Sequence, residues 1–330
     1  MNAKPTNTRP GDFVISLDFE LLWGVRDHAT RASYGAHVLG ARRAIPQILE
    51  RFAQHGTRAT WATVGLLFAA NRDELMAALP PEDLRPRYDN PALSSYAYLD
   101  EIGTNEASDP MVYGAALLDQ IAACPGQEIA THTLSHFYCL EPGATVQAFD
   151  ADLAAACALA AARGITLRSI VFPRNQYATA HLEAAQRHGL THYRGNPPSW
   201  AYRPGAGRAQ HLPRRALRLL DAHTGVLGSH LYTPGGDNVP ASHFLRPCAG
   251  RLAPLHPRHL GVIERAMTRA AQQGKGFHLW WHPHNFGAET EANLAALDRL
   301  LTHFNRLQGD YGMVSRSMGD SGQPLRQGER

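Results

Sequence analysis

Residues 13–20, FVISLDFE, are a short apolar run with β-branched residues that ends in two acidic residues. Such a run predicts a buried β-strand. Helix-spaced apolar residues follow from Val38 to Phe52, and Gly56 is expected to end that helix. The segment 58–65, RATWATVG, then predicts a second strand. The chain therefore begins with a strand–helix–strand unit.

The same alternation continues along the chain. Further strands are predicted at 128–132, 168–172, 191–195, 277–281 and 311–315, with helices between them at about 111–123, 146–162, 179–188, 261–273 and 289–307. Repeated units of this kind indicate a parallel sheet covered by helices. No glycine-rich phosphate-binding loop follows the first strand, which favours a barrel over an open sheet. We therefore expect an α/β fold, a distorted (β/α) barrel with about seven parallel strands.

Two segments interrupt the alternation. Residues from about 70 to 110 are polar and rich in proline, and residues 196–260 contain many Pro, Gly and His residues. We expect both to be insertions in a single barrel domain that spans residues 12–318. Polar tails are expected at 1–11 and 319–330.

The composition excludes several classes of protein. The 330 residues are 44% hydrophobic, and 32 basic residues nearly balance 29 acidic ones. This balance gives no basic surface for nucleic acid, and no apolar run approaches the roughly 18 residues of a membrane-spanning helix. The polar N-terminus is unlike a signal peptide, and the four cysteines form no C-x-x-C pair. We expect a cytoplasmic protein with no nucleic-acid partner and no transmembrane segment, either monomeric or a homo-oligomer.

Polar side chains gather where the predicted strands end. They are Asp18 and Glu20 after the first strand, His132 and His136 in THTLSH (131–136), Arg174 and Asn175 after VFP, and His282 after FHLWW. The carboxyl ends of the strands in a parallel barrel lie on one face, where active sites form. We therefore expect these residues to be close together.

Each of these groups also has an ordinary structural interpretation, in which the acids cap a turn and the histidines pack in the core. However, two histidines and one carboxylate are a ligand set for a catalytic divalent metal. In a helical turn, the i and i+4 positions of His132 and His136 would lie on one face. Asp18 and His282 can then act as base and acid in metal-assisted hydrolysis, with Arg174 orienting Asp18.

Four motifs resemble those of the polysaccharide deacetylase (NodB-homology) family, carbohydrate esterase family 4. They are SLDFE (16–20), HTLSH (132–136), FPRN (172–175) and LWWH (279–282). The resemblance implies a NodB-homology barrel and metal-dependent removal of acetyl groups from glycans. It further implies that Asp18 is the catalytic base, that His132 and His136 bind the metal, that Arg174 borders the site and that His282 is the acid.

The motifs depart from the family pattern in three places. Phe19 separates the two acids, which are adjacent in the usual motif, so the resemblance assigns the third metal ligand to Glu20. Asn175 and Gln176 replace a proline–tyrosine pair. The fourth motif of the family has no clear match and is expected within YRGNPPSW (193–200).

These observations together predict an enzyme that removes an acetyl group from an N-acetylated sugar or glycan precursor. Its cofactor would be one divalent metal ion, Zn²⁺ in the first place, although Co²⁺, Ni²⁺ and Mn²⁺ suit the same ligands. The candidate substrate contacts are Asn175 and three tryptophans that could stack on a sugar ring or pack in the core, Trp23, Trp200 and Trp281. The alternatives are a hydrolase of another C–N bond, such as a deformylase or a cyclic ureide or imide hydrolase, and a catalytically weak carbohydrate-binding relative.

Overall fold

The sheet is parallel and curls into a distorted barrel, as predicted. The computed structural model describes residues 9–207 and 212–323. The strands are β1 (Asp12–Phe19), β2 (Ala59–Thr63), β3 (Gln127–Thr131), β4 (Ser169–Ile170), β5 (His192–Tyr193), β6 (His243–Phe244), β7 (Phe277–Trp281) and β8 (Val314–Arg316). Their order in the sheet is β5-β4-β3-β2-β1-β7-β6, and β8 pairs with β1.

Strand β1 lies at the centre of the sheet, and all of its residues are buried. Its first half pairs with β8, from Asp12 opposite Val314, and its second half pairs with β2, from Ser16 opposite Thr60. Strand β7 pairs with the other edge of β1, from Phe13 opposite Phe277 to Leu17 opposite Trp281. The chain therefore places its first acidic motif in the middle of the barrel.

The two ends of the sheet are joined through the segment before β6. The Tyr193 N–H donates to the Asp237 carbonyl at 2.9 Å, and the Val239 N–H donates to the Tyr193 carbonyl at 2.9 Å. The same segment continues into β6, which pairs with β7. Strand β5 is thereby linked to β6, and the sheet approaches closure.

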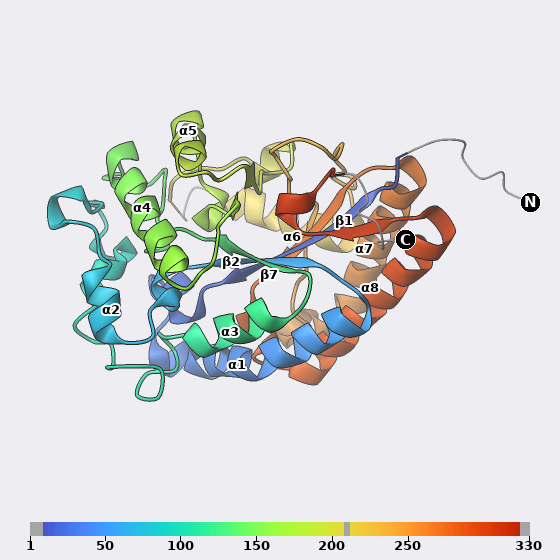
Figure 1. Ribbon diagram of the computed structural model, residues 1–330. Coiled ribbons are helices and arrows are strands. Elements are labelled where there is room, and N and C mark those ends of the chain that lie inside the picture. The colour runs from blue at the N-terminus through green and yellow to red at the C-terminus, as the bar shows by residue number, and fades with distance from the viewer. Residues whose placement is uncertain (1–8, 208–211, 324–330) are drawn as a thin grey trace, which may run out of the picture.

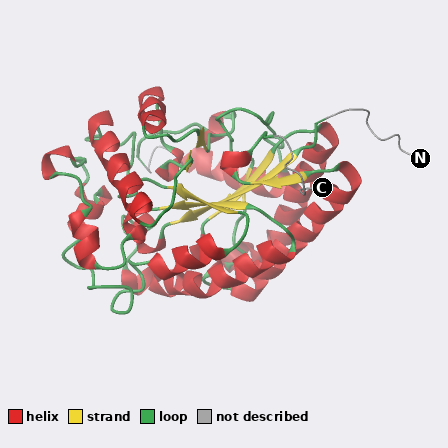
Figure 2. Ribbon diagram, in the orientation of Figure 1, coloured by secondary structure: helices red, strands yellow, loops and turns green. Residues whose placement is uncertain are grey.

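Helices cover the outside of the sheet. They are α1 (Arg31–Gln54), α2 (Arg72–Ala77), α3 (Ala115–Ala123), α4 (Val146–Ala162), α5 (Thr179–Arg187), α6 (Leu212–Thr224), α7 (His256–Gln273) and α8 (Thr290–Tyr311). In the view of Figure 1, α1, α3 and α8 run below the strands, α5 lies above them and α4 lies at their upper left. Figure 2 shows the strands enclosed by helices and loops. In the part of the chain that is described, no helix is long and apolar enough to cross a membrane.

The two irregular segments contain more structure than the sequence indicated. Helix α2 and three 3-10 turns lie within residues 70–110. This segment contacts the chain near THTLSH, because the Ser95 hydroxyl donates to the Ser135 carbonyl. The segment 196–260 contains α6 and β6, neither of which was predicted.

Two element boundaries were also predicted wrongly. The last strand begins at Val314 and not at 311, because α8 continues to Tyr311 and ends at Gly312, where φ is 70°. The expected tail from 319 is packed at its start, because the Gly319 N–H donates to Glu128 and the Ser321 hydroxyl donates to Asp12. The other parts of the expected tails, 1–8 and 324–330, lie outside the described residues. The four cysteines form no disulfide.

Candidate metal centre

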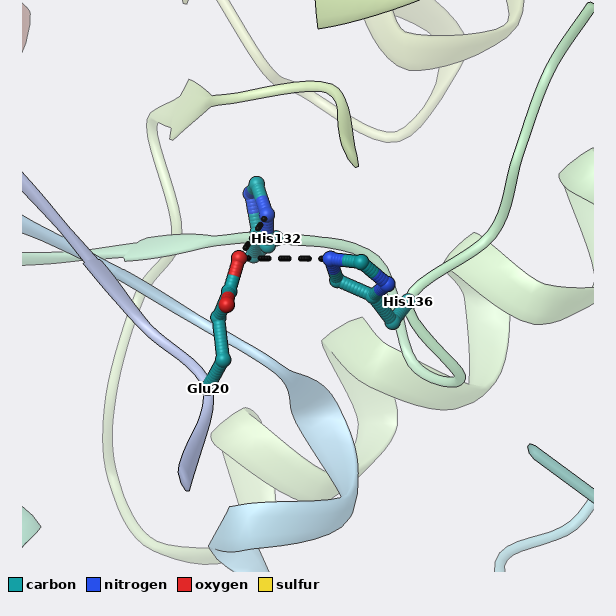
Figure 3. Close-up of side chains that lie close together, drawn as sticks. All are labelled: Glu20, His132 and His136. Atoms are coloured by element: carbon teal, nitrogen blue, oxygen red, sulfur yellow. Dashed lines mark hydrogen bonds and ion pairs between the residues drawn. The ribbon is translucent and has the colours of Figure 1, made fainter. Parts of the chain in front are cut away.

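Glu20, His132 and His136 converge at the carboxyl end of the central strands (Figure 3). Glu20 Oε1 lies 3.0 Å from His132 Nε2 and 3.2 Å from His136 Nε2, and all three side chains are almost fully buried. Glu20 directly follows β1, and His132 directly follows β3. The ligand atoms are close enough to one another to surround a single metal ion.

A loop, and not a helical turn, brings the two histidines together. Thr133 and His136 have positive φ angles of 64° and 58°, and residues other than glycine seldom adopt such angles. The loop is held from outside by Asp152 on α4, which accepts the N–H groups of Leu134 at 2.7 Å and Ser135 at 3.2 Å. The expectation that helical spacing would align the imidazoles was therefore wrong. Backbone strain fixed by α4 aligns them instead.

The outer nitrogen of each imidazole already has a partner. His132 Nδ1 lies 2.7 Å from the Val171 carbonyl, and His136 Nδ1 lies 3.0 Å from the Tyr138 hydroxyl. Because a carbonyl only accepts, His132 Nδ1 carries a proton, and Nε2 is the nitrogen that faces Glu20. Burial lowers the pKa of His136 to about 4, so its imidazole is neutral at physiological pH. Neutral, oriented imidazoles are the form that binds metals.

Two further observations fit a metal ion. Among the described residues, His132 Nε2 is a buried nitrogen with no hydrogen-bond partner, although Glu20 lies close to it. A Cβ atom on Gly24 would lie 1.8 Å from Glu20 Oε2, so this glycine leaves the space that the carboxylate occupies. Burial opposes ionisation of Glu20, but the imidazoles of His282 and His136 outweigh it and hold the pKa well below its usual value. The donor set is one carboxylate and two imidazoles, which suits Zn²⁺ and similar ions.

Asp18 lies beside this centre and forms a buried ion pair with Arg194. The two guanidinium nitrogens donate to the two carboxylate oxygens at 2.6 and 2.8 Å. Burial opposes ionisation of Asp18, but the charges of Arg194 and the nearby histidines lower its pKa below the usual value. Asp18 is therefore an ionised carboxylate at neutral pH.

His282 closes the site on the side of β7. Its Nε2 lies 3.8 Å from Asp18 Oδ2 and 3.7 Å from Glu20 Oε1, and 24% of its side chain is exposed. Trp280 and Phe244 flank the imidazole with ring centroids at 5.7 and 5.9 Å. His282 is the most exposed of the grouped acids and histidines, so it is the one best placed to meet a ligand from solvent.

The comparisons with known proteins find similarity in structure but not in sequence. No family model matches the sequence, and no curated protein matches it. A protein assigned as a polysaccharide deacetylase from Mycobacterium smegmatis aligns with a TM-score of 0.55 and 13% identity, over 91% of this chain and 85% of that chain. PuuE allantoinase aligns with a TM-score of 0.53 and 11% identity, over 92% of this chain and 86% of that chain.

A third protein, assigned as a polysaccharide deacetylase from Pseudomonas aeruginosa PAO1, aligns with a TM-score of 0.50 and 11% identity, over 88% of this chain and 83% of that chain. This chain has the NodB-homology fold of the polysaccharide deacetylases. At identities this low, the likeness concerns the fold alone.

Within this NodB-homology fold, the predicted role of Arg174 was wrong. Arg174 does not reach Asp18. It donates to Glu141 at 3.0 Å and to Asp27, and it stacks on the Tyr138 ring with its guanidinium carbon 4.1 Å from the ring centroid. Arg174 is therefore one layer outside the centre, behind the tyrosine that contacts His136.

Arg194 takes the place that was expected for Arg174, and the sequence reasoning missed it. It follows β5 directly, so it obeys the same strand-end rule that identified the other groups. It also lies in YRGNPPSW, where the fourth family motif was expected. The signal was weak because β5 has only two residues.

The predicted substrate contacts divide into buried and accessible residues. Trp23 and Trp281 are 2% and 0% exposed and pack in the core, so neither can stack on a sugar in this structure. Trp200 is 51% exposed and lies on the surface against Arg214. Asn175 lies beside the centre, where its side-chain oxygen accepts from Arg194 at 3.1 Å. Trp280 lies between Arg194 and His282.

Proposed function

We propose that the protein is a metal-dependent hydrolase that removes the acetyl group from an N-acetylated sugar or glycan precursor. The observation that carries the proposal is the buried group of Glu20, His132 and His136 beside Asp18 and His282. The NodB-homology fold supports it, because proteins assigned as deacetylases have the same fold. The substrate and the metal dependence are both part of the proposal.

The residues divide the chemistry between them. Glu20, His132 and His136 would hold a divalent ion, which would polarise the acetyl carbonyl and lower the pKa of a water molecule. Asp18 takes the proton from the attacking water, since its carboxylate is ionised and held in one orientation by Arg194. His282 gives a proton to the departing sugar nitrogen, because it is the imidazole open to solvent beside both carboxylates. Acetate and a free amine are the products.

The decisive experiment measures metal content and acetate release together. We expect the purified protein to bind about one equivalent of Zn²⁺ and to release acetate from at least one N-acetylated sugar, nucleotide sugar or oligosaccharide. His132→Ala should lose the metal and the activity, because it removes one of three ligands. His55→Ala, at the end of α1 and far from the centre, is the matched control and should keep both. A protein that binds no metal even after Zn²⁺ is added would refute the proposal.

A second function has one observation in its favour. PuuE allantoinase has the same fold, so hydrolysis of a different C–N bond is compatible with this scaffold. The same assay separates the two reactions by their products. Release of formate or ammonia without acetate would identify this second function, whereas metal binding without any hydrolysis would indicate a carbohydrate-binding relative.

A further inference from the structure

A cavity of about 990 Å³ adjoins the candidate metal centre. Asn175, Phe244 and Trp280 line it, and each also contacts a residue of the centre. Asn175 accepts a hydrogen bond from Arg194, while Phe244 and Trp280 flank His282. A molecule bound in this cavity would therefore lie against the Phe244 and Trp280 rings that flank His282.

The wall of the cavity is strongly basic. Six arginines line it: Arg174, Arg203, Arg214, Arg215, Arg218 and Arg246. No aspartate or glutamate is among its described lining residues. The whole chain carries 32 basic and 29 acidic residues, so this is a local concentration of charge and not a general property of the surface.

Arg218 on α6 and Arg246 after β6 are the most informative members of this group. Both are partly buried, and within the described chain neither forms an ion pair with a carboxylate. Arg174, by contrast, is neutralised by Asp27 and Glu141. Burial and the charge of neighbouring arginines lower the pKa of both Arg218 and Arg246. Unpaired, partly buried cations are costly, and a bound anion would offset that cost.

We propose that this cavity binds a phosphate or pyrophosphate group carried by the substrate, so that the N-acetylated sugar is a phosphorylated one. The inference rests on the proposed function for the reaction, but the anion site rests on the arginines alone. A guanidinium group can donate two parallel hydrogen bonds to the oxygens of one phosphate. Several arginines together can neutralise the two or more negative charges of a phosphate or pyrophosphate, whereas a carboxylate carries only one charge. The volume of the cavity accommodates either a sugar phosphate or a nucleoside diphosphate sugar.

The test measures anion binding separately from catalysis. Isothermal titration of the zinc-loaded protein with inorganic pyrophosphate should show binding that is about 10-fold or more weaker in Arg218→Gln/Arg246→Gln. Arg43→Gln/Arg306→Gln removes the same charge from exposed positions on α1 and α8, and should bind like the wild type. Arg215→Gln removes an exposed arginine of the cavity and should weaken binding without any change in melting temperature. Equal pyrophosphate binding by the wild type and the Arg218/Arg246 variant would overturn the inference.

Acetate release then identifies the source of the phosphate. We expect kcat/KM to be higher for N-acetylglucosamine 1-phosphate or UDP-N-acetylglucosamine than for N-acetylglucosamine, and the preference should be lost in Arg218→Gln/Arg246→Gln. The better of the two phosphorylated sugars shows whether a monophosphate or a diphosphate occupies the cavity. If no sugar releases acetate but the arginines still govern pyrophosphate binding, the proposed function is wrong and the anion site stands. If neutral sugars are hydrolysed equally well, the inference is wrong and the proposed function stands.

Discussion

Arg194 connects the candidate base to the interior of the sheet through a chain of buried polar contacts. Its guanidinium donates to Ser16 Oγ at 3.0 Å, and His278 Nε2 lies 2.8 Å from the same oxygen. His278 Nδ1 lies 2.9 Å from the Val239 carbonyl, which fixes the imidazole tautomer with Nε2 as the acceptor. Burial lowers the pKa of His278 to about 3, so it stays neutral. Arg194 is thus a positioning residue with its own rigid support.

Removal of Arg194 should affect both stability and the pH profile. Arg194→Met leaves Asp18 buried without its partner, a change that typically costs about 3–5 kcal/mol. The pKa of Asp18 should rise, because Arg194 is the largest of the charges that lower it. Since the base acts when ionised, the acidic limb of the kcat/KM–pH profile should move to higher pH. Arg194→Lys keeps the charge and should shift the limb less. An unchanged limb in both variants would contradict this role.

The positions of the acids and histidines were the most predictable aspect of the candidate site. Each of these residues lies at the end of a strand or in the loop after it, and parallel strands end on one face; they are Asp18, Glu20, His132, His136 and His282. The partners of these residues could not be located in that way. Whether an arginine such as Arg174 or Arg194 reaches Asp18 depends on the course of loops and on side-chain direction, which spacing along the chain does not determine.

At the scale of elements, the 3-10 turn that follows β1 determines where Glu20, the proposed third ligand, lies. This turn, η1 (Leu21–Gly24), begins directly after Glu20 and folds Gly24 back against the Glu20 carboxylate. Trp23 anchors the turn, because its indole N–H donates to the Val112 carbonyl at 2.9 Å. Trp23, which the sequence placed at the substrate, therefore supports the candidate metal centre from the core.

Gly24→Ala should weaken metal binding without unfolding the protein. The new methyl group would occupy the position of Glu20 Oε2, and the carboxylate would have to rotate away from the histidines. We expect Zn²⁺ affinity to fall by about 10-fold or more, as for changes to supporting residues of metal sites, in a competition assay with a chelating dye. Gly309→Ala on α8 is the control, because a Cβ there meets no atom within 4 Å. Unaltered affinity in Gly24→Ala would show that Glu20 is not a ligand.

Elements were predictable where they were long and periodic. The helices from α3 to α5, and β1, β2, β3 and β7, were all located near their observed bounds. Strand β6, with two residues, carries no periodicity, and its pairing with β7 depends on distant residues. Helix α6 was missed because proline, glycine and histidine in the surrounding segment suggested irregular structure. These two elements supply Arg218 and the wall of the cavity, so the cavity itself could not be predicted.

At the scale of the whole molecule, the stability of the fold should depend on pH through Asp152. Burial raises the pKa of this carboxyl from 3.8 to about 6, although it accepts hydrogen bonds from the loop that contains His132 and His136. The folded state therefore holds the proton more tightly than the unfolded state. The stabilising contribution is complete below the unfolded pKa and is lost as pH rises through the folded pKa.

Asp152→Asn should remove this dependence. We expect the free energy of unfolding of the wild type, relative to Asp152→Asn, to fall as the pH is raised from about 4 to about 7. Urea titrations at several pH values would measure this difference in the free energy of unfolding. A chelator in every sample would keep metal binding, which itself depends on pH, from contributing. Asp298→Asn, at a surface pair with Arg51, is the control for the effect of an Asp-to-Asn change away from this loop. If the wild type instead became more stable relative to Asp152→Asn as the pH rose, the raised pKa of Asp152 would be contradicted.

The central place of β1 has a consequence for how the chain folds during its synthesis. This strand is synthesised before the other strands of the sheet, yet β7 and β8, which pair with it, are synthesised after all the others. Ser16 and His278, which contact each other across β1 and β7, are 262 residues apart in the sequence. Contacts of such long range slow folding, and they leave the β7 side of the apolar strand β1 unpaired until β7 has been synthesised. The nascent protein is therefore a natural client for chaperones, and its first strand is the segment they would need to shield.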